Sequence, residues 1–225
     1  MSHDLFQPSE CTAALLRQLR LDEPCRGRVL EMGPGSGVIL AALAAAGASE
    51  LVGVDIEAEA VRRTRALLRC AGAVRFRVLH GDLWEVVAGE RFDLVVFNPP
   101  QLPVQTEFAG GPRLRSWSQG GSEGREVLDR FVDGLASHLA PGARALVTHG
   151  SFLALDETMR RLAARALRGR VLQTVCAPVP DYKLNALPAP WLDARLGRSL
   201  HRVGRYVFAD FHLVEILHDR DAAST

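Results

Sequence analysis

The sequence has few cysteines, and they are not arranged to bind a metal or to form a disulfide framework. The four lie far apart along the 225-residue chain, at Cys11, Cys25, Cys70 and Cys176. This spacing excludes a zinc ribbon, a redox dithiol and a small disulfide-stabilised scaffold. We therefore interpret them as small apolar residues of a reduced protein, and we expect no metal site.

Secretory and membrane-spanning segments are also missing from the sequence. Residues 1–8 contain no basic stretch followed by an apolar run, which a secretory signal would have. No apolar run approaches the length of about 20 residues that a membrane-spanning helix needs. We therefore expect a cytoplasmic protein with no membrane partner.

The chain lacks an excess of charge of either sign. Lysine and arginine together number 27 and aspartate and glutamate 26, so the formal net charge is +1. No overall field therefore draws the protein to nucleic acid. Four arginines at helical spacing, Arg195, Arg198, Arg202 and Arg205, would form one basic face for an anionic or RNA partner. A solvated surface is the ordinary interpretation of such a face, and we do not favour a nucleic-acid partner.

Internal repeats are absent, and the length fits a single domain over residues 1–225. Strand and helix patterns alternate along the chain. The predicted strands are 29–30, 51–54, 74–78, 92–97, 143–148, 172–177 and 211–217. The longer predicted helices are 38–46, 58–71 and 125–139, and a short one lies near Leu15. This order predicts an α/β fold with a mostly parallel sheet of about seven strands, one antiparallel strand near an edge, and helices on both faces.

A further helix is expected after Asp156, which we expect to cap it. Its predicted buried face consists of Met159, Leu162, Ala163, Ala166 and Leu167. Two segments interrupt the alternation: 108–124, rich in glycine and serine, and 178–210, an insertion between the last two strands. Loops of such length are usually functional or disordered, so 178–210 is a candidate lid over a substrate. Trp117 and Trp191 lie in these segments and would either floor an acceptor pocket or pack in the core.

A glycine-rich turn follows the first predicted strand and precedes a helix. It contains Glu31, Gly33, Gly35 and Gly37. Glycines let the chain turn sharply and let a ligand approach the backbone. The spacing is G-x-G-x-G, and the leading carboxylate would repel a pyrophosphate but attract a cationic amino acid group. Both features favour S-adenosylmethionine over a nicotinamide dinucleotide.

Acidic residues close the next two strands, where ligands of such sheets bind. Asp55 is placed to accept hydrogen bonds from two ribose hydroxyls, and Ile56 follows it. Asp82 is placed to accept a hydrogen bond from an adenine amino group, and Leu83 to cover the ring. Each aspartate alone is also typical of a turn. Together with the glycine-rich turn, in this order, they predict a nucleoside site.

The fourth predicted strand runs directly into Asn98, Pro99, Pro100 and Gln101. The prolines fix the backbone and remove two N–H donors. The Asn98 side-chain carbonyl and the Pro99 backbone carbonyl can accept both hydrogens of a planar amino group, while Gln101 tunes its orientation. Positioning supplies most of the rate in such a site, without a strong base. His149, after the fifth main strand, is either a base or a structural residue.

With these motifs the chain resembles the HemK-type glutamine N-methyltransferases, which methylate release factors, and the wider Asn-Pro-Pro amino-methyltransferases. The resemblance rests on Phe6–Thr12, on Glu31–Gly37 with Asp55 and Asp82, and on Gly120–Phe131. It implies a Rossmann-like class I methyltransferase domain and S-adenosyl-L-methionine as the methyl donor, with S-adenosyl-L-homocysteine as product. It further implies that the cofactor is held by Thr12, Glu31, Gly33, Asp55, Asp82 and Leu83, and the acceptor nitrogen by Asn98. Residues 1–27 would cover the cofactor.

Two features depart from the family pattern. Gln101 stands where the family usually has an aromatic residue, and we expect no separate helical domain before the first strand. The acceptor is therefore open: a protein side chain such as glutamine, a small molecule held under 178–210, or RNA. A non-catalytic subunit that binds the cofactor is a further alternative, against which the complete Asn-Pro-Pro motif argues. Nicotinamide-linked oxidoreduction is a more distant one.

Overall fold

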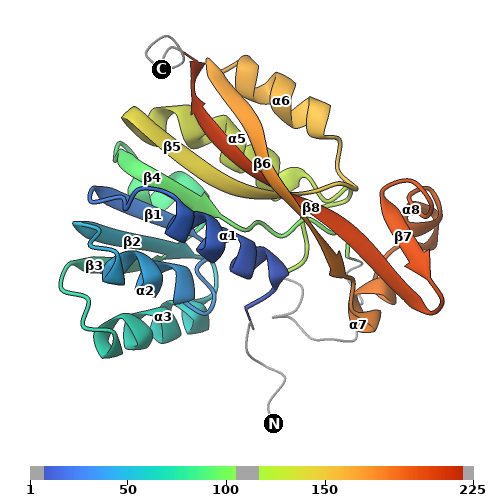
Figure 1. Cartoon of the computed structure of the whole chain (residues 1–225), viewed down its shortest axis with the longest axis horizontal. Coiled ribbons are helices and arrows are strands. Elements are labelled where there is room, and N and C mark those ends of the chain that lie inside the picture. Colours follow the sequence, from blue (N-terminus) through green and yellow to red (C-terminus); the bar gives the residue numbers. More distant parts are fainter. Residues whose placement is uncertain (1–7, 105–116, 220–225) are drawn as a thin grey trace.

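The computed structural model describes residues 8–104 and 117–219. Within these ranges the strands are β1 (Arg28–Met32), β2 (Glu50–Asp55), β3 (Phe76–His80), β4 (Phe92–Phe97), β5 (Leu139–Gly150), β6 (Leu167–Pro178), β7 (Leu200–Val203) and β8 (Tyr206–His218). They form one sheet in the order β3-β2-β1-β4-β5-β8-β6, and β7 pairs with β8 (Figure 1). The chain therefore folds around a single continuous sheet.

The direction of the strands confirms the predicted α/β architecture. β1 to β5 are parallel, whereas β8 runs antiparallel to each of its neighbours β5, β6 and β7. β8 lies next to the edge strand β6, as expected for the antiparallel strand. The sheet has eight strands rather than about seven, because β7 forms inside the 178–210 insertion. Its four residues are mostly exposed, and so they carry no apolar alternation that would reveal a strand.

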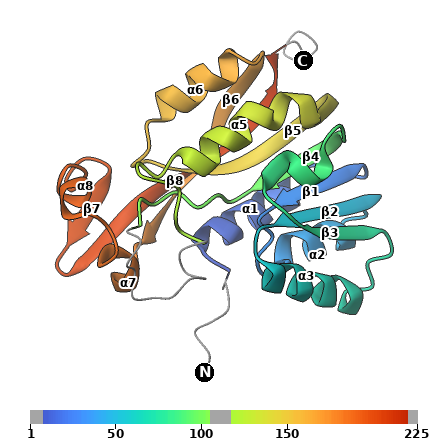
Figure 2. The same ribbon diagram turned by 180° about the vertical axis from the view of Figure 1, so that it is seen from behind.

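Helices cover both faces of the sheet. On one side lie α1 (Glu10–Leu21), α2 (Val38–Ala45) and α3 (Ala58–Cys70), whose apolar residues join one core cluster. On the other side lie the 3-10 helix η1 (Leu83–Val87), α5 (Glu126–His138) and α6 (Leu155–Ala163), which join a second cluster. Figure 2 shows α5 and α6 in front of the strands from that second side. The sheet is thus the middle of three layers.

The central strand β4 shows why the sequence specifies this arrangement. Successive side chains of a strand point to opposite faces. Leu94 and Val96 pack with the α1–α3 side, while Val95 and Phe97 pack with the α5–α6 side. All four are at most 3% exposed, and burial of each contributes about 1.5–3 kcal/mol. A short apolar run with partners on both faces is typical of a central strand, and β4 delivers Asn98 to the carboxyl edge.

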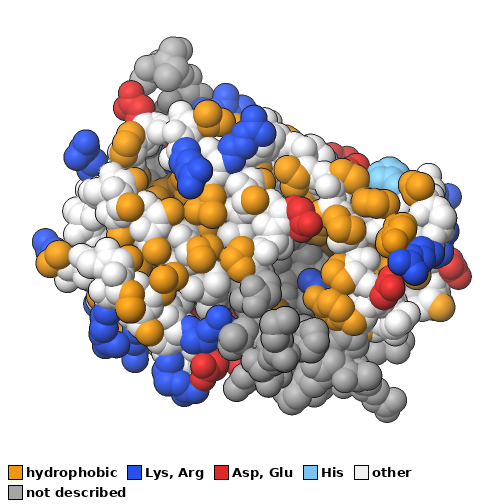
Figure 3. All heavy atoms as spheres, turned by 60° about the horizontal axis from the view of Figure 1, so that its bottom comes forward, with side chains coloured by type: hydrophobic (Ala, Val, Ile, Leu, Met, Phe, Trp, Pro, Cys, Tyr) orange, Lys and Arg blue, Asp and Glu red, His pale blue; other side chains and the backbone are white. Residues whose placement is uncertain are grey.

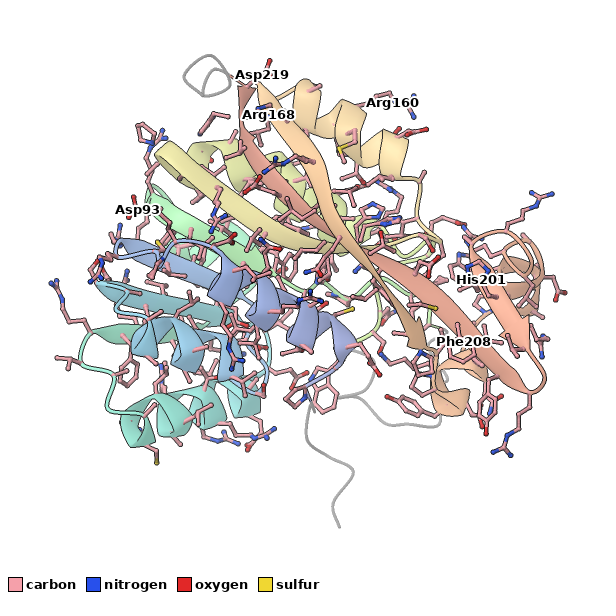
Figure 4. The ribbon with its side chains drawn as sticks, in the orientation of Figure 1. Asp93, Arg160, Arg168, His201, Phe208 and Asp219 are labelled. Carbon is pink, nitrogen blue, oxygen red and sulfur yellow. The ribbon has the colours of Figure 1, made fainter. Side chains whose placement is uncertain are left out.

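The 178–210 insertion lies at that same edge. β5 ends at Gly150, opposite Phe211, but β6 and β8 continue to the pair Pro178 and Phe208. The rest of the insertion contains α7 (Asp181–Leu184), α8 (Ala189–Asp193) and β7. In Figure 4, Asp93 marks the amino end of β4, and His201 and Phe208 mark the hairpin that projects past the opposite end.

The structure corrects two helical predictions. Asp156 does not cap α6: the helix begins after Ala154 and Asp156 lies in its first turn. Ala163 and Ala166 are exposed, and Ala166 adopts a positive φ of 55°. The helix ends at Ala163 because the chain turns there into β6, whose first residue is the buried Leu167.

The predicted basic helical face does not exist. Arg195 and Arg198 lie in the turns after α8, Arg202 lies in β7, and Arg205 lies in the turn between β7 and β8. The spacing therefore does not form one face, because the four arginines are distributed over turns and a strand. On the face shown in Figure 3, Lys and Arg side chains are scattered among hydrophobic and acidic ones. None of the helices in the described ranges has the length and apolar character needed to cross a membrane.

Candidate functional site

The ends of four parallel strands bring the predicted site together. Met32, the last residue of β1, pairs with Val54 of β2 on one side and with Phe97 of β4 on the other. Phe97 in turn pairs with Val147 of β5. The residues that follow these pairs therefore emerge side by side at one edge. They are the glycine-rich turn, Asp55, Asn98 and Thr148.

The glycine-rich turn requires its glycines. Gly33, Gly35 and Gly37 have φ values of 58°, 51° and 80°, a region that other residues adopt only with strain. A β-carbon at Gly37 would lie 3.0 Å from Thr64 of α3. The Gly35 N–H donates to Asp55 Oδ2 across 3.1 Å. The turn and the end of β2 therefore form one cradle of backbone beside a carboxylate.

Glu31 is a buried carboxylate inside this cradle. It is 4% exposed, and its Oε2 accepts a hydrogen bond of 3.2 Å from the Leu40 N–H of α2. Burial, reinforced by the nearby Asp55, raises the pKa of Glu31 well above its usual value. Within the described part of the chain it forms no ion pair. A cationic ligand would relieve this desolvated carboxylate, which fits the amino acid moiety of S-adenosylmethionine.

Asp55 is also held in place by backbone donors. Besides Gly35, the Glu57 N–H donates to its Oδ1 across 2.9 Å, and burial raises the pKa of Asp55. Ile56 is 58% exposed directly beside it, so an apolar side chain is presented at the surface of the cradle. Both positions agree with the predicted nucleoside site, and their contact with a ligand stays a prediction.

The structure places Asp82 and Leu83 at the end of β3, as the sequence indicated. Asp82 Oδ2 accepts a hydrogen bond of 2.8 Å from Arg130 of α5, a partner that lies 48 positions away and that sequence reasoning missed. Leu83 is 9% exposed and has a positive φ of 47°, an uncommon conformation for a leucine. Such strain is concentrated at functional sites, but adenine recognition by this pair stays a prediction.

Thr12 has a local role in α1. Its Oγ1 accepts from the Ser9 N–H at 3.2 Å, and its own N–H donates to Ser9 Oγ at 3.5 Å. This reciprocal pair is a capping box that starts the helix. Thr12 is 3% exposed, and its hydroxyl already has a partner in Ser9. Of the segment 1–27 predicted to cover the cofactor, residues 1–7 lie outside the described ranges, and the covering role of the rest stays a prediction.

Asn98 is fixed by a residue that sequence reasoning did not assign to the site. The Thr148 hydroxyl donates to Asn98 Oδ1 across 2.5 Å, and Thr148 is 2% exposed. The bond determines which way the Asn98 carboxamide points, because only its oxygen can accept from a hydroxyl. The contact follows from the β4–β5 register, which only the structure gives and which places Thr148 opposite Asn98, one step beyond the pair Phe97 and Val147.

Gln101 faces the sheet. It is 4% exposed, and its Nε2 donates to the carbonyl oxygens of Thr148 at 3.1 Å and of Pro99 at 3.4 Å. Its Oε1 accepts from the Gly150 N–H at 2.6 Å. Both polar atoms of the side chain are therefore occupied by backbone groups.

The second glycine-rich stretch, 117–125, wraps the Asn-Pro-Pro segment. The Leu102 N–H donates to Ser118 O at 2.8 Å, and the Gly120 N–H donates to Leu102 O at 2.9 Å. A β-carbon at Gly124, where φ is 80°, would collide with the Gln101 carbonyl oxygen. Glycine is required at Gly124 because the two chain segments touch there. This contact explains why a glycine-rich stretch far along the chain accompanies the Asn-Pro-Pro motif.

Two of the weaker site candidates, His149 and Trp191, are engaged with neighbouring side chains. His149 Nε2 lies 3.0 Å from Thr158 Oγ1 of α6, and burial lowers the pKa of His149 to about 4, so the ring is neutral at pH 7. Trp191 packs against Phe152 and under the Arg195 guanidinium, 4.1 Å from its ring centre. Trp117 is half-buried, and its contact with an acceptor stays a prediction. No cluster of three or more His, Cys, Asp or Glu that could hold a metal exists in the described ranges.

Known proteins resemble the chain in sequence and fold. A family model, the methyltransferase small domain, matches residues 7–108. A Methanocaldococcus jannaschii protein, assigned by name as a protein N5-glutamine methyltransferase, is 35% identical over 159 residues, 71% of this chain and 79% of that protein. The release factor glutamine methyltransferase of Geobacter sulfurreducens is 30% identical over 149 residues, 64% of this chain and 52% of that enzyme. This chain thus spans about half the length of the latter. The solved YcgJ protein of Bacillus subtilis shares the fold, with a TM-score of 0.64 and 16% identity over 91% of this chain and 97% of that one.

Proposed function

Because this chain belongs to the HemK-type methyltransferase family, we propose that it transfers a methyl group from S-adenosylmethionine to the side-chain amide nitrogen of a glutamine in a protein. The observation that carries the proposal is the position of Asn98. Its carboxamide is held by Thr148 at the end of β4, beside the cradle that contains the buried Glu31. A clamp for a planar amide therefore lies next to a site suited to a cationic nucleoside.

On this proposal the cradle residues bind the methyl donor. Glu31 attracts its amino acid group, and Gly33, Gly35 and Gly37 let the ligand approach the backbone without meeting a β-carbon. Asp55 keeps carboxylate lone pairs available for ribose hydroxyls, because each oxygen uses one of them for a backbone N–H. Asp82 and Leu83 take the adenine on this proposal, and Thr12 and Ile56 make the remaining contacts with the donor. When bound, S-adenosylmethionine supplies an activated methyl group.

The Asn-Pro-Pro residues orient the acceptor. Asn98 Oδ1 and the Pro99 carbonyl oxygen accept the two N–H hydrogens of the glutamine amide, and Pro100 keeps the turn rigid. Held in this way, the amide nitrogen presents its lone pair to the methyl group. Positioning of two reactants can supply about 7–11 kcal/mol of the barrier. Neutral His149 under α6 is not placed to act as the base, so the proton leaves to water.

A protein acceptor is favoured over the alternatives by the relatives, whose names specify protein glutamine. The 178–210 insertion would contact the acceptor protein, because it projects from the same carboxyl edge of the sheet at which Asn98 lies. Arg195 links the insertion to the loop after β5 by donating to Phe152 O at 3.0 Å, and Ser151 Oγ donates to Ser199 O at the same distance. An RNA acceptor has no support from a basic helical face.

The test is incubation of the purified protein with methyl-labelled S-adenosylmethionine and a host lysate, with the Asn98→Ala variant as matched control. We expect label in one protein band, absent with the variant, and peptide mapping should place it on a glutamine. Label only in the small-molecule fraction would refute the protein acceptor. No label, with donor binding shown by calorimetry, would refute methyl transfer itself and support a non-catalytic subunit.

A further inference from the structure

At the end of the β4–β5 ladder, the backbone of β4 lacks one N–H donor. The paired residues end at Phe97 opposite Val147, and continuation by two residues brings Pro99 opposite His149. In a parallel ladder, a residue there donates its N–H to the carbonyl before its partner and accepts from the N–H after it. Pro99 would have to donate to Thr148 O and accept from Gly150 N. It has no N–H to donate.

Gln101 contacts those same two backbone groups. Its Nε2 lies 3.1 Å from Thr148 O, and its Oε1 lies 2.6 Å from Gly150 N. A carboxamide carries the same donor and acceptor as a peptide unit. The side chain of Gln101 therefore occupies the position in the ladder that the peptide units around Pro99 would occupy if residue 99 were not a proline.

Because the Gln101 side chain takes this place in the ladder, the hydrogen-bond partners of the Pro99 carbonyl oxygen change. In a regular ladder that oxygen would be bound to the Gly150 N–H and turned into the sheet. Here Gly150 donates to Gln101 instead, and within the described ranges the Pro99 oxygen accepts one long hydrogen bond, of 3.4 Å from Gln101 Nε2. A carbonyl oxygen accepts two hydrogen bonds, so it keeps capacity for an acceptor amide.

We propose that Gln101 is a positioning residue that replaces the missing backbone amide of Pro99 in the ladder with β5, and so holds the Asn98 and Pro99 oxygens toward the acceptor. This inference rests on the proposed function. It differs from direct contact between Gln101 and the acceptor, because both polar atoms of the side chain are engaged with backbone and the residue is 4% exposed. Gly124 packs against the backbone carbonyl of Gln101, so glycine there leaves room for the backbone from which this side chain extends.

Two substitutions separate the ladder role from ordinary packing. Gln101→Met has similar length but forms no hydrogen bonds with Thr148 and Gly150. Gln101→Glu restores the donor and acceptor only when its carboxyl group is protonated, because a carboxylate cannot donate. The measurements are kcat and KM with the labelled protein acceptor, the Kd for S-adenosylmethionine, and hydrogen exchange of the Gly150 amide.

For Gln101→Met we expect kcat to fall about 10- to 100-fold, as for a misplaced reacting group, with the Kd for S-adenosylmethionine unchanged and faster exchange at Gly150. For Gln101→Glu we expect activity relative to the wild type to rise as the pH is lowered. Wild-type kcat and Gly150 protection in Gln101→Met would overturn the proposal. A deficit confined to the KM of the acceptor would also overturn it, because it would indicate direct contact.

The outcomes remain distinct if a variant or the proposed function fails. If Gln101→Met does not fold, a Gln101→Glu profile that parallels the wild type at every pH overturns the inference. If the wild type methylates no acceptor, the proposed function fails, whereas Gly150 exchange in Gln101→Glu at low and high pH still tests the ladder. Protection only at low pH supports the ladder, and equal protection at both overturns it.

Discussion

Replacing Thr148 by valine removes one hydroxyl group and keeps the shape of a buried side chain. That hydroxyl donates to Asn98 Oδ1 at 2.5 Å, at the short end of the range for O–H···O bonds. Thr148 is 2% exposed, so the γ-methyl of valine takes the place of the hydroxyl without new contact with water. The Asn98 carboxamide then loses the partner that sets its orientation.

The size of the effect follows from the energy of one hydrogen bond. Such a bond has a net worth of about 0.5–1.5 kcal/mol, and each 1.36 kcal/mol changes a rate about tenfold. A short bond belongs in the upper half of that range, so kcat should fall about 5- to 12-fold. The Kd for S-adenosylmethionine should not change, because Thr148 lies on the acceptor side of the site. Unfolding free energy should fall by about 1 kcal/mol or less, because half-buried Asn98 can bind water instead.

The assay is kcat with the labelled protein acceptor, together with calorimetric titration of the donor and thermal unfolding. Thr148→Ser is the matched control, because it keeps the hydroxyl and loses the methyl group. We expect Thr148→Ser to lose about 1 kcal/mol of stability, or about 2–4 °C in Tm, while kcat stays near the wild-type value. Wild-type kcat in Thr148→Val, or an equal loss in both variants, would refute the reasoning.

Three further predictions concern the donor site and the clamp. Asn98→Ala should lower kcat by about two orders of magnitude with an unchanged Kd for S-adenosylmethionine; a collapse of donor binding would contradict this division of roles. Asp55→Ala should do the reverse and weaken donor binding first, as titration calorimetry would show, because it removes the carboxylate that Gly35 and Glu57 orient. Burial raises the pKa of Glu31, and only its charged form attracts a cation, so donor affinity should rise with pH through that raised pKa. Glu31→Gln should abolish this dependence. Glu31→Gln should also stabilise the unliganded protein at neutral pH. A carboxyl group whose pKa is raised by folding stabilises the protein while it is protonated, and this contribution is lost as the pH rises through the folded-state pKa. Glutamine stays neutral and does not lose it. Thermal unfolding at several pH values measures this, and an unchanged pH profile would contradict it.

Sequence patterns predicted the central strands of the sheet because these strands are buried on both faces. The run from Phe92 to Phe97 was predicted with the bounds that the structure has, since continuous apolar character leaves few alternatives. The exposed β7, in contrast, carried no such pattern. The four arginines of the insertion failed as a helical face because spacing implies a surface only where the backbone is helical.

The sequence also predicted the order of the site residues at the strand ends. Parallel strands present their carboxyl ends at one edge, so a glycine-rich turn, Asp55 and Asn98 that end separate strands had to meet there. Contacts between distant segments were not predictable in this way. The Asp82–Arg130 pair and the Thr148 hydroxyl on Asn98 depend on how helix α5 packs against η1 and how strand β5 pairs with β4.

Sequence by itself thus determined the fold class, the family and the residues that end each parallel strand, because apolar periodicity and glycine requirements are local properties of the chain. Tertiary structure alone decided the role of Gln101. From the sequence it was a polar residue where an aromatic one is usual, facing an acceptor. In the structure its amide is buried against Thr148 and Gly150. The reason is physical: a proline in a ladder leaves a buried carbonyl without a donor, and only the folded sheet shows which side chain supplies it.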